Sequence, residues 1–345
     1  MSGSLRLSVL DQSPISEGST GTQALANTLD LARHTDGLGF HRYWLAEHHG
    51  GPMLAGAAPE VLIGPVAAAT QRIRVGSGGV MLPHYSPFKV AEAFSILANL
   101  FPGRIDLGLG RASGTDPITA LALQRERNKR LPDDFAQQLA ELLALLDDTM
   151  PVEHPFARLA DLPGGPERPQ QWLLGSSAQS AIWAGELGLS YAFADFINPG
   201  GAEIAADYRA RFAPSAHLQA PRTAVAAWVI CAETTEEAQE LAASSRMSLS
   251  LLRRGKLIPV PPVEKALRYL DEQGEPRGAA PAGRRAIIGN PEKVRADLEA
   301  LASAYGAEEA IAVTITFDHE ARKRSYSLLA EAFGLDAAGA PGPEA

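Results

Sequence analysis

Three residues that can exchange protons stand next to one another in the chain: Glu47, His48 and His49. Histidine changes charge near neutral pH, and a neighbouring carboxylate can orient its ring, so the grouping is typical of acid–base catalysis. We therefore predict His48 and Glu47 as catalytic residues, with Glu47 orienting His48. His49 stays ambiguous, and the two histidines could instead only satisfy the end of a strand. We predict no metal, because no third ligand stands at a typical spacing.

A second candidate group is a set of glycines inside an apolar run. Residues 73–82 contain Gly76, Gly78 and Gly79. Glycine within a strand costs stability unless another backbone or a ligand must come close. The run predicts either a flat ligand lying against the backbone or a β-bulge.

A third group closes the apolar run 105–110 with Leu109, Gly110 and Arg111. The segment lacks the third glycine of a dinucleotide-binding fingerprint. An arginine at the end of a strand favours a phosphate or an acid as its partner. A surface ion pair would explain the same residue.

The fourth group is a set of small residues between an apolar run and a helical pattern: Gly175, Ser176, Ser177 and Ser180. The first turn of a helix has free N–H groups, which bind anions together with nearby hydroxyls. We predict that a phosphate-bearing ligand binds here, while Ser177 could also be a plain N-cap. No GxSxG motif supports a nucleophilic serine.

All four groups fall at the ends of apolar runs that alternate with helical patterns. The runs that we predict as strands span residues 5–11, 43–46, 73–82, 105–110, 172–174, 191–194, 224–232 and 310–317. Strands that alternate with helices pair in parallel through right-handed crossovers. Eight such units predict an α/β fold, the (β/α)8 TIM barrel, with a doubly wound open sheet as the alternative. In a TIM barrel the C-terminal strand ends meet at one mouth, which would bring the four groups together.

Two long segments interrupt this alternation. Residues 112–132 and 253–289 exceed the usual loop length, and such segments commonly form lids, walls or interface arms. The second segment follows the predicted seventh strand and contains a helical pattern near residues 263–272. We predict one TIM-barrel domain over residues 1–336 with an insertion at about 253–289, followed by a disordered tail over residues 337–345.

The composition narrows the partners and the compartment. A net charge of −9 and a pI of about 5.4 argue against nucleic acid and anionic membranes as partners. We find no apolar run long enough to span a membrane and no signal peptide, so we expect a cytoplasmic protein. The single cysteine, Cys231, excludes an intrachain disulfide framework and is expected in a buried strand.

Taken together and in this order, the motifs resemble those of the bacterial luciferase-like, flavin-dependent monooxygenases, in particular their single-chain members. The resemblance covers residues 5 to about 334. It rests on LAEHHG (45–50), VGSGGVMLP (75–83), FPGRIDLGLGR (101–111), LLGSSAQSAIWAGELG (173–188) and GNPEKV (289–294). Residues 112–116 depart from the light-emitting subunits, so the substrate is not carried over.

The resemblance implies a TIM barrel with an insertion after the seventh strand and a reduced-flavin site at the mouth. His48, preceded by Glu47, matches the family's catalytic histidine. The pair Gly78–Gly79 falls where the family often has a cis peptide bond under the flavin ring. Leu109 to Arg111 match a stretch along the flavin edge. The phosphate-binding region is matched by Arg111, Ser176, Ser177 and Ser180.

The resemblance also implies an activity. The protein would be the oxygenase of a two-component flavin monooxygenase: a transient reductase would supply reduced FMN, which reacts with dioxygen to oxidise a small organic substrate. A homodimer is expected, to which the apolar helical pattern 88–100 could contribute. Related subgroups use a deazaflavin and hydride transfer, and some relatives are idle flavin-binding barrels, so both stand as alternatives.

Overall fold

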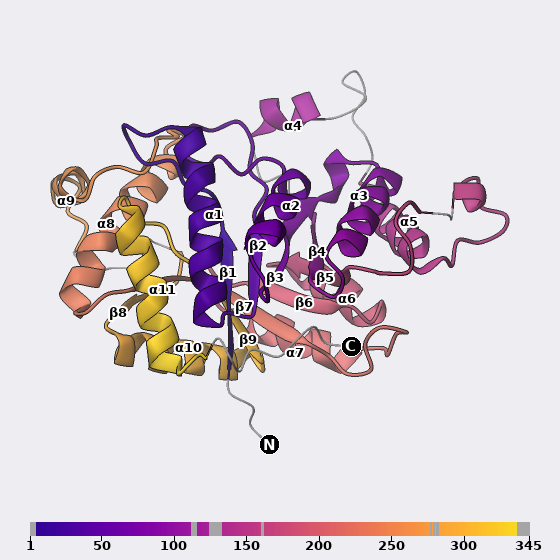
Figure 1. Cartoon of the computed structure of the whole chain (residues 1–345). Coiled ribbons are helices and arrows are strands. Elements are labelled where there is room, and N and C mark those ends of the chain that lie inside the picture. Colours follow the sequence, from indigo (N-terminus) through magenta and orange to yellow (C-terminus); the bar gives the residue numbers. More distant parts are fainter. Residues whose placement is uncertain are drawn as a thin grey trace.

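Eight parallel strands form a closed barrel. The computed structural model describes residues 5–111, 116–123, 133–159, 162–276, 278, 280 and 283–336. The ring runs β1-β2-β3-β4-β5-β6-β7-β9, and β9 pairs back with β1 (Figure 1). The predicted TIM barrel is therefore confirmed, and the open sheet is excluded. The barrel strands are β1 (Arg6–Asp11), β2 (Arg42–Leu45), β3 (Arg74–Met81), β4 (Ile105–Gly110), β5 (Gln170–Gly175), β6 (Ser190–Ala194), β7 (Thr223–Cys231) and β9 (Glu309–Val313).

Helices cover the outside of the barrel, and their ends follow from the local sequence (Figure 1). Thr20 caps the first barrel helix by accepting the N–H of Gln23, and Gly39 ends it in the left-handed conformation. Proline in the first turn opens α2, α3 and α10, where its missing N–H costs nothing. The helices are α1 (Gly21–Leu38), α2 (Pro59–Ala69), α3 (Pro87–Leu100), α4 (Pro117–Leu123), α5 (Phe135–Asp147), α6 (Ala178–Glu186), α7 (Ala202–Arg211), α8 (Thr235–Arg253), α9 (Val263–Glu272), α10 (Pro291–Tyr305) and α11 (His319–Phe333), with short 3-10 turns η1 (Leu82–His84) and η2 (Ala157–Leu159).

The insertion follows the seventh barrel strand and its helix α8, as predicted, and carries α9 and a further strand, β8 (Ala286–Gly289). The helical pattern near 263–272 is confirmed by α9, whereas β8 was not predicted. It pairs with β7 from Trp228 to Cys231, a stretch that overlaps the one paired with β9 only at Trp228. The insertion also returns to the mouth, because the backbones of Ile15 and Glu17 hydrogen-bond to Val260 at 2.8 Å. Glu17 and Lys265 add an ion pair of 2.7 Å.

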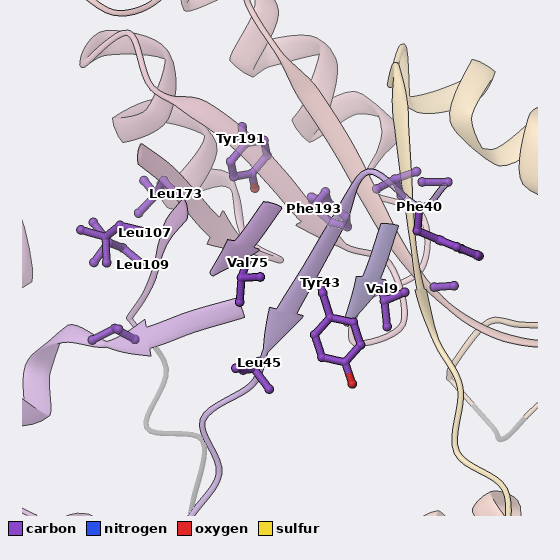
Figure 2. Close-up of a cluster of buried hydrophobic side chains, with 14 of the residues drawn as sticks. Val9, Phe40, Tyr43, Leu45, Val75, Leu107, Leu109, Leu173, Tyr191 and Phe193 are labelled. Carbon is purple, nitrogen blue, oxygen red and sulfur yellow. The ribbon is translucent and has the colours of Figure 1, made fainter. Parts of the chain in front are cut away.

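Side chains alternate along the strands between two apolar layers. Residues such as Val9, Tyr43 and Leu45 point outward and pack against the helices (Figure 2). Their sequence neighbours, such as Leu10 and Trp44, point into the barrel. This alternation explains why the strands read as continuous apolar runs, since parallel barrel strands are buried on both faces.

A layer of buried charges fills the barrel below Trp44. The Arg42 guanidinium lies 2.8 Å from Asp106 Oδ2 and 2.9 Å from Glu309 Oε1, and all three side chains are fully buried. The Trp44 indole donates to the same Asp106 oxygen at 2.9 Å. Although burial alone would raise it, Arg42 and Arg74 hold the pKa of Asp106 at about 2. The paired charges thus occupy the N-terminal end of the barrel, and the opposite end is left for a ligand.

Several expectations concern the cysteine, membrane spans, the chain end and the domain bounds. Cys231 lies buried at the end of β7, where its N–H donates to Ser325 Oγ at 2.9 Å, as expected. Within the described part of the chain, the helices are all too short or too polar to cross a membrane. The expected tail over residues 337–345 lies outside the described residues, as does most of 112–132 apart from α4. The single domain over residues 1–336 stays a prediction.

Candidate functional site

A cavity of about 350 Å³ opens among the C-terminal ends of the barrel strands, a volume within the range of ligand pockets. Its floor is apolar and includes Leu10, Trp44 and Ile311. Of the residues predicted from sequence, those that line it are Gly78, Gly79, Gly110, Arg111, Gly175, Ser176, Ser177 and Ser180. Glu47, His48 and Leu109 do not line it. The fold therefore gathers three of the four predicted groups at one cavity.

The glycines of β3 are required by strand packing. A Cβ on Gly78 would lie 2.5 Å from Leu10 Cδ1, and one on Gly79 would lie 2.7 Å from the Gly108 carbonyl oxygen. The peptide bond between Gly78 and Gly79 is cis, as the resemblance implied. The pairing with β4 shifts between Gly78 and Val80, which bears out the β-bulge alternative. The same peptide also forms part of the cavity wall, so the ligand alternative stays open.

At the end of β4, the predicted residues differ in whether their side chains reach the cavity. The Leu109 side chain is fully buried in the outer apolar layer, so it faces away from the cavity (Figure 2). Arg111 is half exposed, lies 3.6 Å from Asp133, and its guanidinium stacks 5.8 Å from the centre of the Trp183 ring. The ion pair that sequence left as an alternative is thus present. It is loose, and Arg111 still borders the cavity.

The serine segment leads into α6 at the cavity edge. Ser177 is the N-cap residue, yet its side chain caps none of the helix N–H groups. These N–H groups carry the positive end of the helix dipole, which favours an anion. The Ser180 hydroxyl is engaged locally: it donates to the Ser177 carbonyl oxygen at 2.8 Å and lies 3.0 Å from Tyr191 Oη. Ser176 and Ser177 are therefore better placed for an anion than Ser180.

Glu47 orients a different histidine from the one predicted. Its Oε1 lies 2.8 Å from Nε2 of His49, and its Oε2 accepts the Met81 N–H at 2.8 Å. The prediction that Glu47 orients His48 is wrong, because the hydrogen bonds of the Glu47 carboxylate go to His49 and to the Met81 backbone. Since Met81 lines the cavity, Glu47 connects His49 to the cavity wall.

His48 is half-buried, and none of the described residues hydrogen-bonds to its Nδ1. Burial, and then the charge of His49, lowers the pKa of His48 to about 4. The imidazole is therefore neutral at neutral pH and can accept a proton or a hydrogen bond. A buried ring nitrogen without a protein partner is the kind of group that a ligand or water satisfies.

Sequence reasoning missed two residues behind this strand end, Glu60 and Tyr85. Burial, followed by the charges of Glu47 and Glu60, raises the pKa of Tyr85. Each stands just after a proline that opens a helical turn, Pro59 in α2 and Pro83 in η1, which hides them in ordinary helix-start patterns. Their role depends on tertiary contacts alone, so no local signal could have identified them.

Comparison with known proteins shows the family to which the chain belongs. A family model described as luciferase-like monooxygenase matches residues 5–308. The uncharacterized protein YwcH of Bacillus subtilis is 48% identical over 95% of this chain and 98% of its own length. The N-acetyl-S-alkylcysteine monooxygenase of the same organism is 40% identical over 95% of this chain and 98% of its own.

Several solved structures have the same fold. Apo-MsnO8 is 41% identical, with a TM-score of 0.86 over 97% of this chain and 99% of its own. The oxygenating constituent of 3,6-diketocamphane monooxygenase from Pseudomonas putida, in complex with FMN, has a TM-score of 0.69 at 21% identity over 96% and 98%. An F420-dependent secondary alcohol dehydrogenase has a TM-score of 0.68 at 13% identity over 96% and 99%. The last two likenesses concern the fold alone.

Proposed function

The chain belongs to the luciferase-like monooxygenase family, and we propose that it uses reduced FMN and dioxygen to oxidise a small organic substrate. The observation that carries the proposal is the cavity, which joins the Gly78–Gly79 peptide to Arg111 and the uncapped start of α6. A ligand with a flat ring and a phosphate at one end matches this cavity. The ring can lie against the Gly78–Gly79 peptide, and the phosphate can lie beside Arg111 and the start of α6. FMN is such a molecule, and the 3,6-diketocamphane enzyme with the same fold holds it.

The residues that line the cavity suit the chemical groups of FMN, and they lie in an arrangement that matches its phosphate and its ring. Arg111 supplies a cation, and Ser176 and Ser177 supply hydroxyls beside the free N–H groups of α6, so these residues would hold the phosphate. The flavin ring would lie against the Gly78–Gly79 peptide, over an apolar floor that excludes water. Bound there, FMN would supply electrons and react with dioxygen.

We propose that His48 exchanges a proton or a hydrogen bond with the bound ligand. Its neutral ring and its unpartnered Nδ1 support this role. Glu47 would act through His49 and the Met81 backbone rather than on His48 itself. Replacement of His48 by Gln, which keeps a polar side chain without a proton-exchanging ring, is expected to lower turnover about a hundredfold or more. Unchanged turnover would remove His48 from the chemistry.

Two other cofactor assignments compete with FMN. The F420-dependent dehydrogenase with the same fold keeps a deazaflavin enzyme as the alternative, and an idle flavin-binding barrel is the third. Titration of the purified protein with FMN, reduced FMN and F420 separates them. Tight binding of F420 alone would overturn the proposal, and flavin binding without turnover of any substrate would favour the idle barrel.

The proposed reaction needs a reductase and leaves the substrate to be found. We propose that a transient reductase supplies the reduced FMN, as the resemblance to two-component flavin monooxygenases implies. The experiment is to mix the protein with photoreduced FMN and air and to follow flavin absorbance. N-acetyl-S-alkylcysteines, named for one relative, are the first substrates to supply. If the protein shows neither flavin binding nor an oxygen-dependent spectral change, the proposal is refuted. The cytoplasmic location stays a prediction.

We further propose a homodimer through α2 and α3, which pack against each other (Figure 1). Three large apolar side chains stand outward on them: Val61 and Leu100, each 65% exposed, and Ile96, 44% exposed. An apolar patch on paired helices is typical of a subunit interface. Sedimentation of the protein at several concentrations tests this, and a monomer at all of them would exclude it.

A further inference from the structure

Two alanines on neighbouring strands leave room on one side of the mouth cavity. Ala194 of β6 and Ala226 of β7 are paired in the sheet register, and both line the cavity. Ile311 of β9 is paired with Ala226 on its other side and also lines the cavity. By contrast, Trp228 stands two residues further along β7, on the same side of the strand. We call Ala194 and Ala226 the alanine pair.

The loop after β6 covers the alanine pair. Phe196 is buried and lines the cavity, and its backbone N–H donates to the carbonyl oxygen of Ala226 at 3.2 Å. The Phe196 ring meets the Trp228 ring edge-on, with 5.9 Å between the ring centres. A backbone contact and a ring contact therefore fix Phe196 beside the alanine pair.

The insertion holds this loop from outside the cavity. Nη1 of Arg284 donates to the Phe196 carbonyl oxygen at 2.8 Å. The neighbouring Arg285 pairs at 3.0 Å with the fully buried carboxylate of Asp195, which also accepts the Tyr305 hydroxyl at 2.7 Å. Neither arginine lines the cavity, so the insertion acts on it through the position of Phe196.

The alanine pair faces the place proposed for the flavin ring. In the closed ring of eight strands, β3 and β7 are four strands apart and therefore lie opposite each other. A flat ring against the Gly78–Gly79 peptide of β3 thus turns its other face towards Ala226. The cavity-lining side chains on this side are hydrocarbon: Ala192, Ala194, Phe196, Ala226 and Ile311. A polar group placed here would lose its hydration without gaining a partner.

We propose that Ala194, Ala226 and Phe196 are specificity-determining residues that select a substrate with a short alkyl group. The alkyl group lies between the flavin ring and the alanine pair. It is short because one cavity of about 350 Å³ holds the ring as well. Arg284 is a positioning residue that acts through the Phe196 backbone. The inference rests on the proposed function for the flavin ring, and it adds the class of substrate.

The test is a calorimetric titration of the protein, loaded with oxidised FMN, with N-alkylacetamides whose alkyl group grows from methyl to hexyl. In the wild type, affinity should rise about fourfold with each added methylene until the space is full, and then fall. Ala226→Leu should weaken binding of the butyl compound about tenfold and leave the methyl compound nearly unchanged. Phe196→Ala should move the optimum the other way, to longer groups.

Ala194→Val, at a partly exposed position, should favour shorter groups as Ala226→Leu does, and it serves if the leucine variant does not fold. A purely structural role would weaken the binding of all the acetamides alike. An equal loss for every chain length, or no dependence on chain length in the wild type, would overturn the proposal.

Arg284→Met tests the positioning role, because it keeps an extended side chain without a donor. The preference for short groups should weaken in this variant, and Arg284→Lys, which can still donate, should restore part of it. Arg254→Met is the matched control, since Arg254 also belongs to the insertion but hydrogen-bonds to Gln273. Identical chain-length profiles for Arg284→Met and Arg254→Met would exclude Arg284 from this role.

The same titrations on the flavin-free protein separate this inference from the proposed function. If the chain-length preference shifts in Ala226→Leu but the protein binds no FMN, only the proposed function is refuted. If the protein binds FMN and the profile is the same in wild type, Ala226→Leu and Phe196→Ala, only the substrate class is refuted.

Discussion

Removal of the Arg111 guanidinium is expected to weaken FMN binding about tenfold and to leave riboflavin binding unchanged. The two flavins share one ring system and differ by the phosphate. Arg111 is the sole Lys or Arg among the described residues that line the cavity, and it stands beside the start of α6. A difference between the two ligands therefore reports on the phosphate contact and not on ring packing.

The magnitude follows from the environment of Arg111. A hydrogen bond to a charged group contributes roughly 1.5–3 kcal/mol when it is sheltered from water. The Arg111 side chain is 50% exposed and already pairs with Asp133 at 3.6 Å, so solvent and a competing carboxylate both weaken its hold. We therefore take the lower end, about 1.4 kcal/mol, which corresponds to tenfold in Kd.

The assay is a calorimetric titration of wild type and Arg111→Ala with FMN and with riboflavin, at low and high salt. Screening should shrink the FMN difference at high salt. Asp133→Asn should tighten FMN binding, because it frees Arg111 from its partner. Arg168→Ala, at a residue outside the cavity, is the matched control. An equal loss of both flavins in Arg111→Ala, or no loss of FMN, would refute the phosphate assignment.

Three further predictions follow from packing and charge. Gly79→Ala should lower the free energy of unfolding by about 1–3 kcal/mol, measured by urea denaturation, because its Cβ would meet the Gly108 carbonyl at 2.7 Å. Because the pKa of His48 is lowered to about 4, the unfolded chain binds more protons below about pH 6.5, and stability falls towards pH 4 by up to about 3 kcal/mol. His48→Gln should flatten that fall, and an unchanged slope would contradict the burial argument. Leu100→Glu should turn a dimer into monomers in sedimentation, and a persistent dimer would place the interface elsewhere.

The fold could be predicted because its signals are local. The boundaries of β4 follow from a short apolar run between a Pro-Gly turn and Arg111, and they agree residue for residue with the structure. β8 was missed because a strand of four residues inside a segment rich in Pro and Gly carries too little periodicity. The predicted last strand ran on to residue 317 whereas β9 ends at Val313, since the apolar run continues into the loop at the mouth.

The sequence could predict only those site residues whose type suits a ligand and whose position lies at a strand end. Gly78 and Gly79 lie near the C-terminal end of β3, and Arg111 and the serines follow strand ends; a barrel brings strand ends together whatever the side chains are. Leu109 failed as a cavity residue because one step along a strand reverses the side chain. Glu60 and Tyr85 depend on helix placement, which no local pattern records.

The two adjacent histidines therefore divide between two environments, although the sequence presents them as a pair. His48 is neutral and has no protein partner at Nδ1 among the described residues, so it is available to a ligand. Nε2 of His49 lies 2.8 Å from the fully buried Glu47 carboxylate. The separation arises beyond the last residue of β2, Leu45, where the Glu47 carboxylate meets His49 at 2.8 Å and not His48. One ring is therefore open to a ligand at Nδ1, whereas the other is fixed by the Glu47 carboxylate.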